Sequence, residues 1–269
     1  MPSQQNACLE FRRLHETGCF VIPNPWDEGS ARVLTQFGFR ALATTSAGFA
    51  WCQGRADHHI TLAEALEHFR SIAATVDVPV SADFAAAFAV DPEKVADNVA
   101  AAAATGIAGL SVEDGSRQSD RPLFEFDLAV DRVRAARRAI DAGSAPLVLT
   151  ARSEGFVVGR PDLAETIRRL TAFAGAGADC VYAPGIRTKS EITAIVAAVS
   201  PTPVNVGVGS DFTTVAELAA LGVRRISVGG ALARAAWTGF LQAATEIAER
   251  GTFTALGRAV SGADINGRF

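Results

Sequence analysis

Short apolar runs alternate with longer amphipathic stretches along the whole chain. Eight of the runs have the length and composition of strands, and their starts are about 20 to 40 residues apart. They occupy residues 19–23, 41–45, 78–82, 109–112, 147–151, 180–183, 204–206 and 225–228. The stretches between them have helical periodicity. Strands separated by helices in this way predict parallel βαβ units.

Eight such units predict a closed (β/α)8 TIM-type barrel over residues 1–250. Glycines that end several helices fit left-handed caps and support this count: Gly38, Gly106, Gly177 and Gly222. An open doubly wound sheet is the competing architecture, and it would leave two sheet edges to protect. Residues 231–250 predict one more helix. Residues 251–269 form a C-terminal extension, in which we expect a further helix over residues 253–260.

Two groups of polar side chains on the predicted helices are expected to face solvent. The first is a basic cluster interleaved with aliphatic residues: Arg132, Arg134, Arg137 and Arg138. The second consists of His15 and His68, which lie in helical patterns. We expect neither group to take part in the chemistry.

Composition and charge narrow the class of protein. Of 269 residues, 49% are hydrophobic and 20% charged, which is typical of a well-packed α/β domain. The net charge of −4 gives no electrostatic reason to expect nucleic acid or an anionic membrane as partner, so a small molecule is expected. No apolar run approaches the length of a membrane helix. Four unpaired, widely spaced cysteines favour reduced thiols and a cytoplasmic location.

Three predicted strands end on charged residues. Asp83, Glu113 and Arg152 each stand at or just after such an end, and Glu154 follows two positions later. The carboxyl ends of parallel barrel strands share one face, so these side chains are expected to meet around an anionic ligand and its metal. An enzyme is therefore the leading hypothesis.

The order and spacing of several further motifs resemble a known family over nearly the whole chain. The motifs are Asn24-Pro25-Trp26-Asp27, Thr44-Thr45-Ser46-Ala47-Gly48, Gly54-Arg55-Ala56-Asp57, the three strand ends, Ala176-Gly177-Ala178-Asp179-Cys180 and Leu221-Gly222-Val223-Arg224-Arg225-Ile226-Ser227. Together they resemble the isocitrate lyase and phosphoenolpyruvate mutase superfamily. The resemblance implies a barrel enzyme that depends on Mg²⁺, with Mn²⁺ as an alternative ion, and acts on small 2-oxo or related acids through an enolate-like intermediate.

The same resemblance implies catalytic roles for individual residues. Asp83 and Glu113 would hold Mg²⁺ largely through ordered water, as this ion prefers. Arg152 would bind the substrate carboxylate or the charge that develops on its oxygen. Asp57 matches a position in the family's mobile loop that approaches the reacting bond.

Substrate-binding positions follow from the resemblance as well. Backbone and hydroxyl donors around Thr45, Ser46 and Gly48 would hold the carboxylate. Glu154 and Asn205 match polar positions that flank the site.

The chain departs from the family pattern in two places. Ser81-Ala82-Asp83 stands where the family has Asp, any residue, Asp, so a hydroxyl replaces one carboxylate near the metal. The lyase segment of Lys-Lys-Cys-Gly-His type is absent from residues 114–121, and so are the Lys and Asn of the mutase loop. We therefore do not expect isocitrate or methylisocitrate lyase activity that uses a cysteine as general acid. Four residues remain open as replacements for the loop function: Asp57, Arg117, Asp120 and Arg121.

The leading interpretation is a carbon–carbon lyase or decarboxylase of a 2-oxo or 2-hydroxy acid. One alternative is phosphorus–carbon chemistry of the phosphonopyruvate hydrolase or phosphoenolpyruvate mutase type. Another is a phosphate-ester enzyme, because residues 207–210 and Gly229-Gly230 occupy positions where many barrels bind phosphate. A third is a non-catalytic protein that binds 2-oxo acids. The resemblance also implies a homo-oligomer, a dimer of dimers in which the C-terminal extension packs on a neighbouring subunit.

Overall fold

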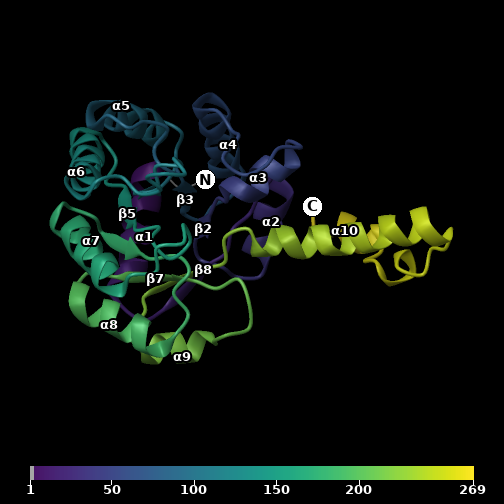
Figure 1. Ribbon diagram of the computed structural model, residues 1–269. Coiled ribbons are helices and arrows are strands. Elements are labelled where there is room, and N and C mark those ends of the chain that lie inside the picture. Colours follow the sequence, from purple (N-terminus) through teal and green to yellow (C-terminus); the bar gives the residue numbers. More distant parts are fainter. Residues whose placement is uncertain (1–2) are drawn as a thin grey trace.

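Eight parallel strands close into a barrel in the computed structural model, which describes residues 3–269 (Figure 1). The strands are β1 (Phe20–Ile22), β2 (Leu42–Ala43), β3 (Val80–Asp83), β4 (Gly109–Glu113), β5 (Val148–Arg152), β6 (Cys180–Tyr182), β7 (Val204–Gly207) and β8 (Arg225–Ser227). They pair in the order β1-β8-β7-β6-β5-β4-β3-β2. The Ala43 amide donates to the Pro23 carbonyl at 3.0 Å across the remaining seam. The barrel prediction is confirmed, and the open sheet is wrong.

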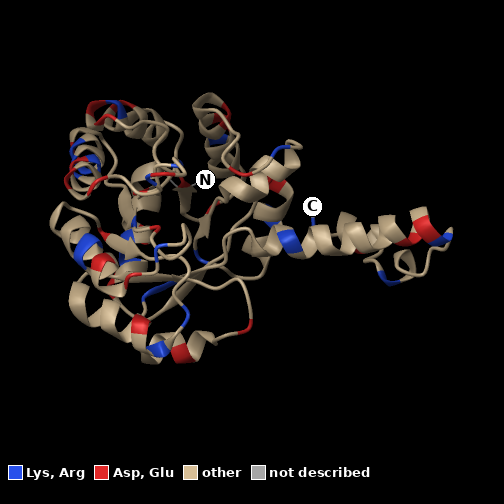
Figure 2. Cartoon of the chain, in the orientation of Figure 1, with Lys and Arg blue, Asp and Glu red and all other residues tan. Residues whose placement is uncertain are grey.

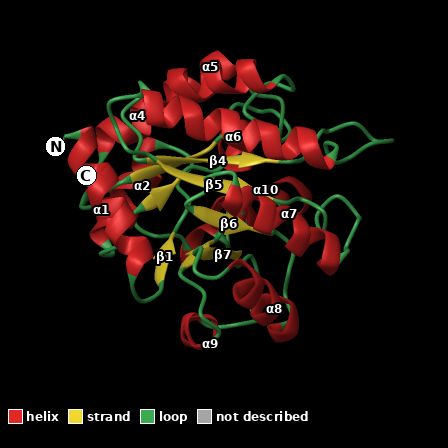
Figure 3. Ribbon diagram, turned by 90° about the vertical axis from the view of Figure 1, so that its left-hand side faces the viewer, coloured by secondary structure: helices red, strands yellow, loops and turns green. Residues whose placement is uncertain are grey.

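Helices surround the strands on the outside of the barrel (Figure 3). The helices as far as residue 250 are α1 (Gln4–Glu16), α2 (Glu28–Gln36), α3 (Ser46–Cys52), α4 (Leu62–Thr75), α5 (Pro92–Ala103), α6 (Phe126–Ala142), α7 (Leu163–Gly175), α8 (Lys189–Val199), α9 (Val215–Ala220) and α10 (Ala231–Arg250), of which α1 and α10 lie outside the surrounding ring. The four predicted glycine caps have φ between +81° and +102°, a backbone region that side chains with a Cβ rarely enter.

Helix α1 covers the end of the barrel where the strands begin. Phe11 lies so close to the start of β4 that a Cβ on Gly109 would stand 2.7 Å from its ring. Arg12 donates to the carbonyls of Pro146 and Leu147, which precede β5. Because α1 covers this end, the opposite face, where the strands end, is left for a ligand.

The expected exposure of the basic cluster and of two histidines is wrong in part. Arg132 is only 1% exposed and Arg137 pairs with Asp179, whereas Arg134 and Arg138 have exposed side chains. His15 and His68 are both buried. Helical periodicity shows which face is polar. It does not show which flanks are covered by neighbouring helices, and in this ring α5 packs closely on α6.

The C-terminal part of the chain leaves the barrel. Only Ala233 of the 20 residues of α10 is buried, and the helix runs away from the strands (Figure 1). The middle of α10 carries no charged residue (Figure 2). Even so, no helix within residues 3–269 is long and apolar enough to cross a membrane.

The extension beyond α10 differs from the predicted helix over residues 253–260. It contains a single 3-10 turn, η1 (Leu256–Arg258), and a short helix, α11 (Gly262–Asn266). The last residues return to α2 of the same chain, where Gln36 donates to the Arg268 carbonyl and the Arg268 guanidinium lies 5.5 Å from the Phe37 ring. The packing of the extension on a neighbouring subunit stays a prediction.

Candidate active site

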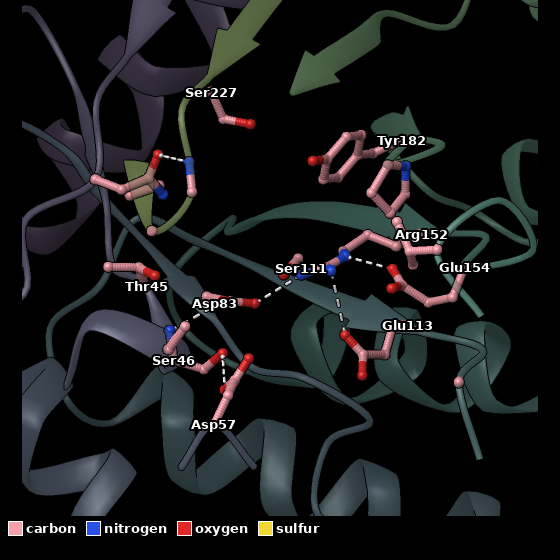
Figure 4. Close-up of a pocket in the computed structure, with 18 of the residues that line it drawn as sticks. Thr45, Ser46, Asp57, Asp83, Ser111, Glu113, Arg152, Glu154, Tyr182 and Ser227 are labelled. Atoms are coloured by element: carbon pink, nitrogen blue, oxygen red, sulfur yellow. Dashed lines mark hydrogen bonds and ion pairs between the residues drawn. The ribbon is translucent and has the colours of Figure 1, made fainter. Parts of the chain in front are cut away.

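A cavity of about 650 Å³ opens at the carboxyl ends of the strands. Most of the residues predicted for the site line it: Thr45, Ser46, Asp57, Asp83, Glu113, Arg152, Glu154 and Asn205. Figure 4 shows seven of these side chains pointing toward one another. Ser81, at the position where the family has a carboxylate, also lines the cavity. The convergence of the strand ends is therefore as expected.

Four charged residues form one side of the cavity, which we call the acid half: Asp83, Glu113, Arg152 and Glu154. The Arg152 guanidinium lies 2.8 Å from Asp83 Oδ1 and 3.4 Å from Glu113 Oε2. Its Nε donates to Glu154 Oε1 at 2.9 Å (Figure 4). Three carboxylates from three strand ends thus share one cation.

This crowding changes the proton affinities of the acid half. Burial raises the pKa of Glu113 to about 7; Arg152 opposes the rise, and Glu154 and Asp83 add to it. Burial also raises the pKa of Glu154, against the effect of Arg152. Burial alone would lower the pKa of Arg152, yet the neighbouring carboxylates raise it well above its ordinary value. Arg152 therefore stays charged, and its single positive charge does not balance the three carboxylates around it.

A buried ion pair supports the acid half from behind. Asp114 Oδ1 accepts the Glu154 amide at 2.8 Å, and Oδ2 accepts from Arg169 at 3.1 Å and from the Ser153 hydroxyl at 3.2 Å. Asp114 and Arg169 are 2% and 7% exposed. The pair fixes the backbone at the position where Glu154 enters the cavity.

A second support comes from the buried Arg132. Its guanidinium donates to the carbonyls of Glu113 and Ala89, each at 3.0 Å, and to that of Ala86. The loop after β3 has positive φ at Ala85, Ala87 and Phe88, which costs free energy without a compensating contact. Arg132 thus ties a strained loop to the end of β4.

The segment after β2 connects Asp57 to the acid half. The Ser46 amide donates to Asp83 Oδ2 and the Ser46 hydroxyl to Asp57 Oδ1, both at 3.1 Å (Figure 4). The Thr45 hydroxyl caps α3 by accepting the Gly48 amide at 3.3 Å. Gly48 does not line the cavity, and a Cβ there would lie 2.7 Å from the Thr45 side chain. Its predicted carboxylate contact stays a prediction.

The opposite side of the cavity, which we call the amide half, consists of Asn24, Asn205, Arg225 and Ser227. Arg225 Nε donates to Asn205 Oδ1 and Asn205 Nδ2 to the Ser227 hydroxyl, both at 2.9 Å. Arg225 NH1 lies 3.4 Å from His15 Nε2. Arg225 is 5% exposed, and within residues 3–269 no carboxylate pairs with it. The amide half therefore contains a buried cation with neutral partners.

Local packing and hydrogen bonds explain the glycines at the end of β7 and after β8. A Cβ on Gly207 would stand 2.2 Å from the Tyr182 hydroxyl, so this close approach requires glycine. The amides of Val228 and Gly229 donate to Asn24 Oδ1 at 2.9 and 2.8 Å. These amides are engaged by a side chain, and no observation favours a phosphate site there.

Among the residues that line the cavity, sequence reasoning did not assign several polar ones to the site, including Asn24, Ser111, Tyr182, Arg225 and Ser227. Tyr182 ends β6 and Ser227 ends β8, so the strand-end rule applied to Arg152 could have found both. Arg225 begins its strand, and no such signal marks it.

The donor set of the cavity suits a hard divalent cation. Within the described residues, no three His, Cys, Asp or Glu side chains are grouped to bind a metal directly. Asp83 and Glu113 offer two carboxylates, and Mg²⁺ commonly takes one or two and keeps several waters. When ionised, the four cavity carboxylates outnumber its three arginines, which leaves a negative charge that a cation would offset.

Comparisons with known proteins agree with this architecture. Residues 11–248 match the family model of phosphoenolpyruvate phosphomutase. A Mycobacterium tuberculosis protein of unassigned function (strain ATCC 25618 / H37Rv) is 30% identical over 223 residues, which are 82% of each chain. A crystal structure from Burkholderia cenocepacia J2315, provisionally assigned as a lyase/mutase, is 48% identical with a TM-score of 0.94 and covers 98% of this chain and 95% of that one.

Two structures of similar fold contain oxalate. Oxaloacetate acetylhydrolase with its product oxalate is 25% identical with a TM-score of 0.87, covering 100% of this chain and 95% of that one. Phosphonopyruvate hydrolase with oxalate and Mg²⁺ is 23% identical with a TM-score of 0.85, covering 99% and 95%. The second likeness concerns the fold alone.

Proposed function

We propose that this chain, which belongs to the phosphoenolpyruvate mutase and isocitrate lyase superfamily, is a Mg²⁺-dependent enzyme that cleaves a carbon–carbon bond in a small 2-oxo or 2-hydroxy acid. The acid half is the main support for the proposal, because it combines a permanently charged arginine with more carboxylates than this arginine can balance. Such a site suits a planar, doubly negative enolate of pyruvate type together with its cation.

Asp83 and Glu113 would hold the metal ion, largely through water. Bound there, Mg²⁺ would offset the negative charge that develops on the substrate oxygen. Arg152 would bind the substrate carboxylate through its planar fork of donors. Thr45 and Ser46 would complete the carboxylate site from the β2 side, whereas Gly48 lies outside the cavity lining and its amide donates to the Thr45 hydroxyl.

Asp57 would act as the general acid or base near the leaving group. Its carboxylate is held by the Ser46 hydroxyl, which belongs to the same residue whose amide binds Asp83. Asn205 and Glu154 would fix the substrate from the two sides of the cavity. Leaving groups such as carbon dioxide or an aldehyde fit the same enolate-stabilising residues.

The oxalate bound as product by oxaloacetate acetylhydrolase supports the choice of probe. Oxalate has the planar, dianionic form of an enolised pyruvate. We therefore propose to measure oxalate binding by calorimetry with Mg²⁺ and with a chelator. The wild type would be compared with Asp83→Asn and with a control, Asp131→Asn, whose carboxylate lies on the surface of α6.

The proposal expects oxalate binding that requires both Mg²⁺ and Asp83 and is unchanged in Asp131→Asn. Absence of oxalate binding by the wild type would overturn it. Turnover assays with oxaloacetate, substituted malates and phosphonopyruvate then separate the alternatives. Release of pyruvate from phosphonopyruvate would favour phosphorus–carbon chemistry, and binding without turnover of any of these acids would favour a non-catalytic binding protein.

We also propose that the protein is a homo-oligomer, a dimer of dimers, in which α10 packs on a neighbouring subunit. The support is the apolar surface of α10, where Trp237, Phe240 and Leu241 are 38%, 60% and 55% exposed. Light scattering should give a tetrameric mass, and Phe240→Asp should lower it. A monomeric mass for the wild type would contradict the proposal.

A further inference from the structure

A short hairpin forms one wall of the cavity next to the acid half. It spans residues 115–123 and is closed at its base by an antiparallel bridge between Gly115 and Leu123. The Ser116 amide donates to the Pro122 carbonyl at 2.9 Å, and the Phe124 amide to the Asp114 carbonyl at 2.8 Å. The base is therefore fixed to the end of β4, directly after Glu113.

Arg117 extends from this hairpin into the cavity. It lines the cavity, and its NH2 lies 3.8 Å from Glu113 Oε1, too far for a hydrogen bond. Its φ is +63°, a conformation that costs free energy for a residue with a side chain. The strained backbone holds a cation at the cavity wall.

The other two cavity arginines already have hydrogen-bond partners. Arg152 pairs with three carboxylates, and Arg225 donates to Asn205. Within residues 3–269, the Arg117 guanidinium donates no hydrogen bond and has only the weak ion pair with Glu113. Its side chain is 36% exposed, so its donors are accessible from the cavity.

We propose that Arg117 binds a second carboxylate of the substrate, so that the enzyme prefers dicarboxylic over monocarboxylic 2-oxo or 2-hydroxy acids. This inference rests on the proposed function, in which Mg²⁺ and Arg152 hold the first carboxylate and the neighbouring oxygen. The cavity of about 650 Å³ is much larger than a three-carbon acid and leaves room for the second group. A free guanidinium is the side chain best suited to a carboxylate at that distance.

The test compares malate with lactate, two 2-hydroxy acids that differ by the second carboxylate. Calorimetry with Mg²⁺ should show tighter binding of malate by the wild type. Arg117→Gln should weaken malate binding by about ten- to hundred-fold, the usual effect of losing a charge-assisted hydrogen bond. Oxalate and lactate binding should change by less than about three-fold, and Arg117→Lys should retain part of the preference.

Arg121→Gln is the matched control, because Arg121 lies in the same hairpin but does not line the cavity, has a 70% exposed side chain and pairs with Asp120. It should bind all three acids like the wild type. The inference is overturned if the wild type binds oxalate yet shows no preference for malate, or if Arg117→Gln weakens oxalate and malate equally. A wild type that binds no oxalate at all would instead remove the proposed function itself.

Discussion

The two sides of the cavity balance a buried arginine in opposite ways. In the acid half, Arg152 is surrounded by three carboxylates, so that side has an excess of negative charge. In the amide half, Arg225 has Asn205 and His15 as partners, and its positive charge is uncompensated by any carboxylate within residues 3–269. One side of the cavity therefore attracts a cation, whereas the other attracts an anion.

This difference suggests how one cavity accommodates a metal ion and an acid together. Under the proposed function, the carboxylates of the acid half would hold a divalent cation, and Arg225 would attract the anionic substrate from the other side of the cavity. Variants that change the charge of either half provide the sharpest tests of this arrangement.

The largest effect is expected for Arg152→Met. Removing one member of a buried ion pair commonly lowers the free energy of unfolding by about 3–5 kcal/mol, because the remaining charges stay buried without a partner. Oxalate affinity, measured with Mg²⁺, should fall by about a hundred-fold or more. Arg152→Lys should lie between Met and wild type, and near-normal binding by the Met variant would contradict the assignment.

Acid should affect the amide half through His15. The pKa of His15 is lowered from 6.5 to about 3, chiefly by burial and also by the nearby Arg225, while the hydrogen bond with the Phe11 carbonyl opposes the shift. The unfolded chain then binds more protons than the folded one below pH 6.5. Stability is lost as the pH falls from 6.5 toward 3, by about 2 kcal/mol at pH 5.

Glu113 affects the pH dependence of stability in the opposite direction. Its raised pKa of about 7 stabilises the fold at low pH, and this contribution is lost as the pH rises through 7. The contribution of His15 is therefore isolated by comparing His15→Gln with the wild type in urea at pH 7 and pH 5. The variant should lose about 2 kcal/mol less than the wild type between these two pH values, and parallel losses would refute the prediction.

A smaller effect is expected for Asn205→Asp, which gives Arg225 a carboxylate partner. The amide half then loses its net positive charge, and oxalate affinity should fall by about ten-fold. Asn205→Ser removes the amide without adding a charge and should have a weaker effect. Equal affinities for the Asp and Ser variants would show that charge in this half is irrelevant.

The smallest effect is expected from inorganic phosphate. The amides of Val228 and Gly229 are engaged by Asn24, so excess phosphate should change the apparent oxalate affinity by less than about two-fold. Strong competition of phosphate with oxalate would instead favour the phosphate-ester alternative, provided that a substitution in the amide half removes this competition but leaves oxalate binding intact.

The strand-end rule explains why the acid half could be predicted. Asp83, Glu113 and Arg152 are each the last residue of a strand, and strand ends meet whatever the details of packing. The amide half was found only in part. Arg225 begins its strand, and its partner His15 lies 210 residues earlier on α1, a contact that no local pattern encodes.

The helices show a similar limit. Arg132 has the spacing of a solvent-facing residue, yet it reaches between α6 and the loop after β3 to bind backbone carbonyls. Its burial depends on backbone carbonyls of a loop in which Ala85, Ala87 and Phe88 have positive φ. These residue types give no signal of that conformation in the sequence. The sequence therefore predicted the elements and their order more fully than the contacts between them.

The hairpin of residues 115–123 closes through backbone contacts at its base, and its tip contributes little to the barrel. Residues at the tip can therefore be exchanged with little effect on the free energy of folding. In evolutionary terms the hairpin is a separable segment, through which substrate preference could change while the barrel residues that we propose for metal and enolate binding stay the same.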